Sequence, residues 1–335
     1  MQTVQAVLRL FAVLPAGGLA HAQEFPSMTN LRSIHWVAVL AMGMIVAAPS
    51  PARAQAESNG IFTGQMVVTV QGNRQMPELP QQDVSAEVDG KDSQISQWKP
   101  LRGPEAPLQL VFLIDESTPA SISLQFPMMK DFIRKLPPST EVAVAYMLNG
   151  RAVFQKPLTT DHAAAADTLR LPNSLPGVTG SPYFALSDLA KKWPSKAKTR
   201  RVVFMLTNGE DPYYRTNDLQ DPYVRTSIID CQKAGLLVYS LYFHDIATRG
   251  FGSMGTLFGQ SYLLMVSTET GGVAYTEAMT TPVSVAPFLK EFQTSLNNQY
   301  MTTITSTRGG LQRVKVTSKR KGTKLRAPAR VNFGS

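Results

Sequence analysis

The sequence predicts an α/β fold: a doubly wound, mostly parallel sheet of six strands, with a small β-rich flank built from the N- and C-terminal segments. From residue 106 to 299, short apolar runs alternate with longer segments of helical periodicity, which is the order of elements in a parallel sheet covered by helices on both faces. On either side of that range, alternating and β-branched runs occur without helices between them. A chain of 335 residues has enough material to bury such a core.

The first 54 residues are typical of an export signal. Residues 7–22 and residues 28–54 each contain an arginine, an apolar run and a small-x-small ending, as a cleaved signal peptide does. The apolar run at residues 36–48 is too short to span a bilayer comfortably. We expect Met28 to be the true start, cleavage after Ala54, and a secreted or periplasmic protein without a stable membrane span.

The flanking segments, residues 55–105 and 300–335, are predicted to be β structure. Residues 62–72 alternate, and residues 81–100 hold two short alternating runs separated by an Asp-Gly turn. The last segment has a two-strand pattern around Gly309-Gly310, so we expect a C-terminal β-hairpin followed by a basic tail.

Six strands and six helices are predicted between the flanks. Asn149-Gly150 is a strong hairpin signal, so the third strand should lie antiparallel at an edge of the sheet. Pro127 should kink the first helix or delay its start. The strands are expected at residues 108–114, 141–148, 151–157, 200–206, 236–243 and 272–276, and the helices near residues 121–136, 161–170, 181–193, 222–234, 257–269 and 283–298.

Polar side chains follow two of these strands. The stretch "VFLIDESTP" runs from an apolar strand into an acidic, hydroxyl-rich tip, and "VVFMLTNGEDP" repeats that order about ninety residues later. Because the carboxyl ends of parallel strands gather at one edge of a sheet, Asp115 and Ser117 should lie near Thr207 and Asn208.

A third loop is expected at the same edge, with a hydroxyl from Thr179 or Ser181 where a helix begins. Hard cations such as Mg²⁺, Mn²⁺ or Ca²⁺ take oxygen ligands, so these side chains predict a metal site made of Asp115, Ser117, Thr179, Ser181 and Asn208. The alternative is that Asp115 and Asn208 only cap loops by pairing with backbone amides.

The residues around this site are typical of a recognition surface. The loop at residues 211–225 contains three tyrosines and two arginines. Nearby acidic side chains are expected to steer a cation or to hold it through water. The expected ligand surface consists of Glu116, Glu210, Asp211, Tyr213, Tyr214 and Arg215.

These motifs resemble a von Willebrand factor type A (VWA) domain. Its metal-ion-dependent adhesion site (MIDAS) reads Asp-x-Ser-x-Ser after the first strand, a Thr in a Gly-rich loop, and the Asp of Thr-Asp-Gly after the fourth strand. The chain is similar, from residue 62 to its end, to exported acidobacterial VWA-related proteins, through "QQDVSAEVDGKDSQISQWKP" and "PLTTD". The resemblance implies a Rossmann-like fold and a non-enzymatic binding or adhesion module, which recognises a protein or matrix ligand at the strand tips.

The chain departs from the family pattern at two positions. Pro119 stands where the family has its second Ser, and Asn208 stands where it has the second Asp. Asp115 is then the only carboxylate assigned to the inner site, which lowers the expected cation affinity. An Asn can still offer its carbonyl oxygen.

Two other functions remain open. One is a structural envelope protein with a non-functional metal site. The other is a nucleotide-dependent enzyme using "GFGSMG" from Gly250 to Gly255, which fits Gly-x-Gly-x-x-Gly but follows the fifth strand rather than the first, and is expected to be a flexible surface loop. Nucleic-acid binding is not expected, because the charge of +9 is spread along the chain and its basic C-terminal run has no interleaved aromatics.

Overall fold

Two β-sheets organise the chain, and the computed structural model describes residues 60–103, 106–173, 180–214, 216, 218–244, 252–277 and 282–334. These residues belong to one unit, residues 57–335. The expected export signal lies outside the described residues. No helix in the part of the chain that the structure describes is long and apolar enough to cross a membrane.

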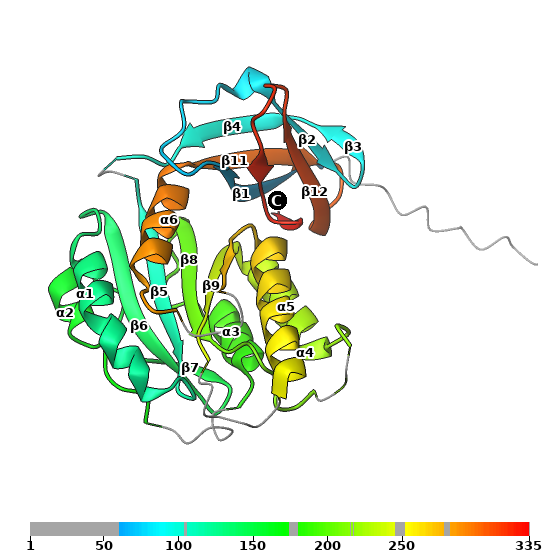
Figure 1. Cartoon of the computed structure of the whole chain (residues 1–335). Coiled ribbons are helices and arrows are strands. Elements are labelled where there is room, and N and C mark those ends of the chain that lie inside the picture. Colours follow the sequence, from blue (N-terminus) through cyan, green and yellow to red (C-terminus); the bar gives the residue numbers. More distant parts are fainter. Residues whose placement is uncertain are drawn as a thin grey trace, which may run out of the picture. The chain divides into compact units, whose positions relative to one another are not determined.

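The first sheet has six strands in the order β10-β9-β8-β5-β6-β7 (Figure 1). All neighbours are parallel except β6 and β7, so the predicted antiparallel edge strand is confirmed. Asn149 and Gly150 form the connecting turn with φ of 51° and 69°. The strands are β5 (Leu108–Asp115), β6 (Thr140–Leu148), β7 (Arg151–Phe154), β8 (Arg200–Thr207), β9 (Leu236–Tyr242) and β10 (Ala274–Tyr275).

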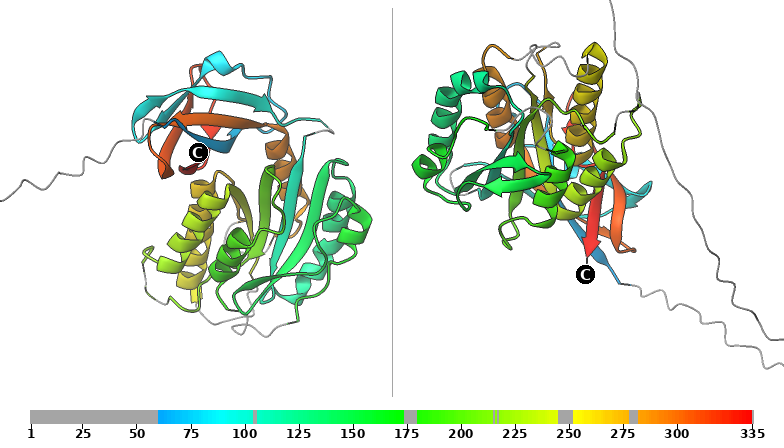
Figure 2. Two further views of the ribbon diagram at one scale, coloured as in Figure 1. Left: turned by 180° about the vertical axis from the view of Figure 1, so that it is seen from behind. Right: turned by 90° about the horizontal axis from the view of Figure 1, so that it is seen from below.

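Helices cover both faces of this sheet (Figure 2). Pro127 lies in the first turn of α1, after a 3-10 helix, η2 (Ala120–Gln125), so the helix starts late as predicted. Helix α5 begins at Gly252, inside the segment that was expected to be a flexible glycine loop; that expectation was wrong for its last four residues. The helices are α1 (Phe126–Arg134), α2 (His162–Ala166), α3 (Pro182–Lys191), α4 (Pro222–Ala234), α5 (Gly252–Thr270) and α6 (Ala286–Asn297).

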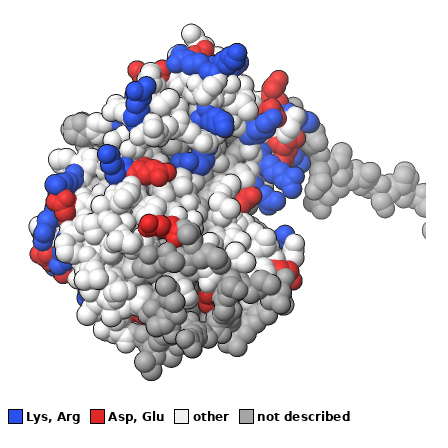
Figure 3. Space-filling model, viewed as in Figure 1, with Lys and Arg blue, Asp and Glu red and all other residues white. Residues whose placement is uncertain are grey.

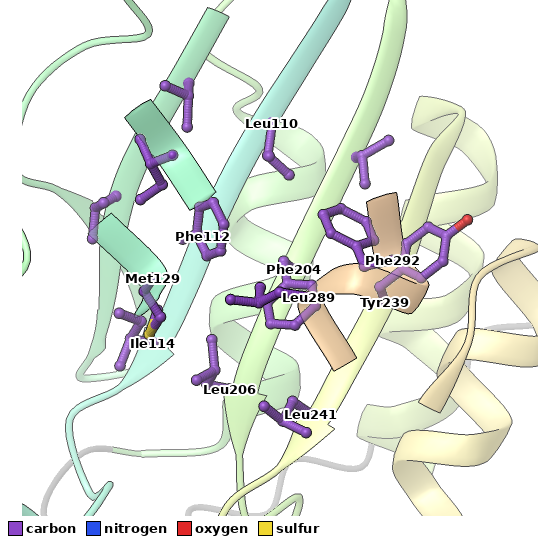
Figure 4. Packing of buried hydrophobic residues seen from close by; sticks show 14 of the residues in the cluster. Leu110, Phe112, Ile114, Met129, Phe204, Leu206, Tyr239, Leu241, Leu289 and Phe292 are labelled. Atoms are coloured by element: carbon purple, nitrogen blue, oxygen red, sulfur yellow. The ribbon is translucent and has the colours of Figure 1, made fainter. Parts of the chain in front are cut away.

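Two hydrophobic clusters sit on opposite faces of the six-stranded sheet because strand side chains alternate. Leu110 and Phe112 of β5 point to the side covered by α1, α2 and α6, where Phe292 packs against Phe204 (Figure 4). Val111 points to the opposite side, which α3, α4 and α5 cover. Both faces of the central strands are therefore buried, and their polar ends are confined to the edge of the sheet.

The second sheet has eight strands from the two ends of the chain, in the order β3-β2-β12-β14-β1-β11-β4, with β13 paired to β1. Its buried side includes Val68, Tyr300 and Phe333. The strands are β1 (Phe62–Val70), β2 (Val84–Val88), β3 (Lys91–Ser93), β4 (Ile95–Pro100), β11 (Gln299–Ser306), β12 (Gly310–Ser318), β13 (Leu325–Arg326) and β14 (Arg330–Gly334), and a 3-10 helix, η1 (Gln81–Asp83), precedes β2.

The expected C-terminal β-hairpin is wrong. Strands β11 and β12 do not pair with each other; β11 pairs with β1 and β4, and β12 pairs with β14 and β2. The basic tail is not a plain tail either, since it forms β13 and β14. The physical reason is that both edges of β11 are occupied, by β1 and by β4, so β12 pairs with β14, whose Val331 and Phe333 are buried.

A buried arginine joins the start of β8 to the junction between α6 and β11. Arg200 is 5% exposed, and its Nη1 donates to Leu296 O at 2.9 Å and to Gln299 Oε1 at 2.8 Å. Gln299 Nε2 in turn donates to Tyr239 Oη at 3.0 Å. Burial lowers the pKa of Arg200 to about 10. This network connects the six-stranded sheet with β11 of the second sheet.

Candidate functional site

The tips of β5 and β8 are joined through one carboxylate. Asp115 is 2% exposed; its Oδ1 accepts from Ser117 N at 2.9 Å and from Ser117 Oγ at 2.8 Å. Its Oδ2 accepts from Thr207 Oγ1 at 2.7 Å. The two strand ends therefore lie together, as the sequence predicts, and Thr207 makes the direct contact from β8.

Asn208 shapes the turn that follows β8. Its Oδ1 accepts from Glu210 N at 3.0 Å, and Thr207 Oγ1 accepts from Gly209 N at 3.1 Å. Gly209 has a φ of 71°, and a Cβ there would lie 2.5 Å from Gly259 O of α5. Glycine is required because the turn and helix α5 touch backbone to backbone. In this geometry the Asn208 side chain acts as a turn former, as the alternative interpretation of the sequence expected.

The middle loop brings Ser181 to a second carboxylate. Ser181 caps α3 by accepting from Tyr183 N at 3.2 Å, and its Oγ donates to Asp211 Oδ2 at 2.7 Å. Gly180 has a φ of 80°, and a Cβ there would lie 2.8 Å from Gly150 N, so this loop rests on the turn between β6 and β7. Thr179, the other candidate for this position, lies outside the described residues.

Asp211 was expected on the exposed ligand surface, and that is wrong. Asp211 is only 4% exposed. Its carboxylate accepts hydrogen bonds from Ser181 Oγ and, at 2.8 Å, from Tyr213 N. Burial is the main reason that its pKa is raised. The sequence could not reveal this orientation, because Asp211 lies three residues beyond the position where the family pattern has its Asp.

Tyr183 contacts the turn after β8, and sequence reasoning missed it. The ring is fully buried, and Tyr183 Oη donates to Gly209 O at 2.5 Å. Burial raises its pKa well above the usual value, and the charges of Asp211, Asp221 and Asp115 raise it further. The phenol thus attaches helix α3 to the turn after β8. Its position directly after a Ser-Pro helix start carried no signal of this contact.

Glu116 was expected to steer a cation from the surface, and this too is wrong. The side chain is 2% exposed and forms an ion pair with Arg170. Its Oε2 accepts from Asn173 N at 2.6 Å. Both oxygens of Glu116 are therefore bonded within the chain, to Arg170 and to Asn173 N, and the side chain is not part of the exposed surface. Arg170 escaped sequence reasoning because it lies 54 residues away, after a helix.

An aromatic cluster lies beside the site. The ring of Phe184 is 5.3 Å from that of Tyr213 and 4.7 Å from that of Tyr223, and Tyr213 is 61% exposed. Tyr214 donates to Asp218 Oδ1 at 3.0 Å. Glu210 is half-buried, and desolvation raises its pKa. Of the predicted surface, Tyr213 is the most accessible described member, and Arg215 lies outside the described residues.

The side-chain atoms at the strand tips that could bind a metal ion are all oxygens. They come from two carboxylates and three hydroxyls: Asp115, Asp211, Ser117, Ser181 and Thr207. Among the described residues, no group of three or more His, Cys, Asp or Glu side chains could hold a metal ion. Such a set does not form an all-protein cage. Its atoms are the oxygen type that hard cations such as Mg²⁺ take as ligands, usually together with several waters.

No protein-family model matches the sequence, and no curated protein sequence matches it. Similar solved structures include an aerotolerance-related membrane protein from Bacteroides fragilis NCTC 9343, with 13% identity over 57% of this chain and 98% of that one, and a TM-score of 0.41. Proximal thread matrix protein 1 from the mussel byssus, with a zinc-occupied MIDAS motif, shares 16% identity over 60% of this chain and 48% of its own, with a TM-score of 0.39. The ArnB paralog VWA2 from Sulfolobus acidocaldarius shares 10% identity over 80% and 76%, with a TM-score of 0.36. Identities and TM-scores this low support no conclusion about the chemistry or the partner of this chain.

Proposed function

We propose that this chain is a von Willebrand factor type A domain protein, and that it is an exported module that binds a protein or matrix ligand at the carboxyl ends of β5 and β8. The observation that supports this most is the direct bonding of the two tips through Asp115, which gathers Ser117 and Thr207 at one point. Because parallel sheets place their binding sites at this edge, a buried carboxylate surrounded by hydroxyls here favours ligand recognition.

A hard cation, Mg²⁺ or Mn²⁺, is part of the proposal. The predicted set of Asp115, Ser117, Thr179, Ser181 and Asn208 is retained, with Thr207 and Asp211 added as oxygen donors. Asp211 offers the second carboxylate that Asn208 does not supply. When bound, the cation would supply a Lewis acid to which a carboxylate of the ligand binds.

The aromatic cluster supports a protein or matrix partner. Exposed Tyr213 and half-exposed Tyr223 pack on Phe184, so their rings are held in place before a ligand arrives. Tyrosines offer a large contact area at low entropic cost. Figure 3 shows Lys and Arg interspersed with acidic side chains on the face in view, which gives no support there for a nucleic-acid surface.

The alternative of a structural protein with a non-functional metal site has its own support. Ser117 and Thr207 already satisfy both oxygens of Asp115 without a cation. Calorimetric titration separates the two functions. Mg²⁺ and Mn²⁺ would be titrated into residues 55–335 as wild type, Asp115→Ala, Asp211→Asn and, as a control, Asp92→Asn on the exposed strand β3.

We expect one binding event in the wild type and in Asp92→Asn, none in Asp115→Ala, and weaker binding in Asp211→Asn, because a lost carboxylate lowers cation affinity. Circular dichroism checks that each variant is folded. A folded wild type that takes up neither ion would instead support the structural alternative.

A further inference from the structure

A buried ion pair lies directly beside the strand-tip site. Glu116 follows Asp115 in the chain, and both of its carboxylate oxygens are bonded: one to Arg170 Nη2, and the other to Asn173 N at 2.6 Å. The Glu116 side chain is 2% exposed, and that of Arg170 is 34% exposed. The Asp115 loop is thus attached to a segment that is distant in sequence.

Arg170 is itself held at both its backbone and its side chain. Its guanidinium carbon lies 4.0 Å from the ring centroid of Tyr146 on β6. Tyr146 Oη accepts from Arg170 N at 2.8 Å and donates to Arg170 O at 2.7 Å. Arg170 Nε also donates to Gln155 Oε1 at 3.2 Å. The fully buried Tyr146 therefore fixes the position from which Arg170 reaches Glu116.

The ion pair attaches the Asp115 loop to a well-held part of the chain. Glu116 lies between Asp115 and Ser117, so the position of its backbone constrains theirs. Its bonds to Arg170 and to Asn173 N attach this loop to residues 170–173. Those residues are themselves held through the bonds of Arg170 to Tyr146 and Gln155.

We propose that Arg170 and Glu116 form a clamp that holds the Asp115 loop against residues 170–173, and that the clamp sets the affinity of Asp115 and Ser117 for a cation. This inference rests on the proposed function. Glu116 and Arg170 are positioning residues, since neither would touch the cation. Without Arg170 the buried Glu116 charge has lost its partner, and it reaches water only if the loop that carries Asp115 and Ser117 moves.

The chemistry of the clamp requires arginine. A guanidinium can pair with a carboxylate and lie flat on an aromatic ring at once, whereas a lysine keeps only the charge. The informative variants are therefore Arg170→Lys, Arg170→Ala and Glu116→Gln. Arg134→Ala is the matched control, because Arg134 pairs with Asp167 on the same segment, at an exposed position that does not touch the Asp115 loop.

Two measurements are made on residues 55–335: the affinity for Mn²⁺ by calorimetry, and amide hydrogen exchange at residues 115–118 and 171–173 without metal. We expect Arg170→Lys and Arg170→Ala to lower the affinity about tenfold or more, as loss of outer-shell support does, and to speed exchange in both segments. The Mn²⁺ affinity and the exchange rates of Glu116→Gln should lie between those of the Arg170 variants and those of the wild type. Arg134→Ala should match the wild type in both measurements.

An Arg170→Lys variant with wild-type affinity and wild-type exchange would overturn the clamp. Unchanged exchange at amides of β5 and β8 shows that a variant is still folded; if Arg170→Ala fails this check, Arg170→Lys and Glu116→Gln decide. A wild type that takes up no Mn²⁺ would end the proposed function and the affinity part of this inference. In that case, amide exchange would still decide whether the clamp orders residues 115–118 and 171–173.

Discussion

At the scale of single residues, hydrogen bonds between buried polar atoms hold the strand tips together. Thr207 has two roles there: its hydroxyl donates to Asp115 Oδ2 and accepts from Gly209 N. The residue is fully buried, so water cannot replace either bond. A hydroxyl in this place both joins the two strand tips and fixes the start of the turn that contains Asn208.

Thr207→Val, which keeps the shape and removes the hydroxyl, should lower the free energy of unfolding by about 1–3 kcal/mol, because it leaves buried polar groups without a partner. Urea denaturation measures the change. Thr226→Val is the control, since Thr226 donates its hydroxyl at an exposed position on α4 and should change stability little. Equal stability of Thr207→Val and the wild type would show that the link between the tips is weak.

Asp221 gives a pH dependence with a definite sign. It caps α4 by accepting from Tyr223 N and Val224 N, and burial is the main reason that its pKa is raised above 3.8. The folded chain therefore holds this proton more tightly than the unfolded chain. The stability that the group contributes is present at low pH and is lost as the pH rises through the window above 3.8.

Asp221→Asn keeps a good capping residue and cannot titrate. Denaturation in metal-free buffer at several pH values should show that the wild type loses stability relative to the variant as the pH rises from about 4 toward neutrality. A constant difference between the two would contradict the raised pKa.

At the scale of elements, the site is held by loops that pack backbone to backbone on their neighbours. Gly209 against Gly259 ties the turn after β8 to α5, and Gly180 against Gly150 ties the middle loop to the turn between β6 and β7. A side chain at any of these contacts would push a loop away from the site. The strand tips are therefore positioned by neighbouring elements as well as by their own hydrogen bonds.

Gly209→Ala should destabilise the chain by about 1–3 kcal/mol more than Gly235→Ala, as measured by thermal or urea unfolding. Both glycines have positive φ, 71° and 66°, so the backbone strain is similar. Only Gly209 faces a backbone oxygen, at 2.5 Å from the added Cβ, while nothing lies within 4 Å at Gly235. Equal losses of stability in the two variants would show that the turn at Gly209 moves away from α5 without a measurable loss of free energy.

The order of elements was predictable from the sequence, and the partners of several residues were not. Periodicity located the six strands, and Asn149-Gly150 identified the antiparallel edge, because both signals are local. Glu116 and Asp211 were assigned to the ligand surface because they lie next to the predicted metal site in the sequence. Their burial depends on Arg170 and Ser181, which are distant in sequence. The wrong C-terminal hairpin has the same cause, since alternation reveals a strand but not its neighbour.

At the scale of the whole molecule, the two sheets are expected to unfold together. Arg200, Gln299 and Tyr239 form a buried network between β8, β9 and the start of β11. Backbone bonds add to it, from Val70 N to Asn298 O at 2.9 Å and from Leu101 N to Gln299 O at 2.8 Å.

The two tryptophans in residues 55–335 report on the two sheets separately. Trp98 on β4 stacks on Tyr300, and Trp193 after α3 donates to Gln109 Oε1. Single-tryptophan variants made with Trp98→Phe or Trp193→Phe should give coincident urea transitions, and Arg200→Ala should lower both midpoints together, because it leaves buried acceptors unpaired. Transitions that separate in the wild-type background would show that the sheets unfold independently.

We propose that the strand tips form one cation-dependent binding site. Paramagnetic broadening of the amide NMR signals of residues 55–335 by Mn²⁺ tests this proposal most directly, because the broadening both detects the ion and locates it. We expect the signals of Ser117, Ser181 and Gly209 to broaden first in the wild type and to stay sharp in Asp115→Ala. Broadening centred on another part of the chain, or none at all in the folded wild type, would contradict it.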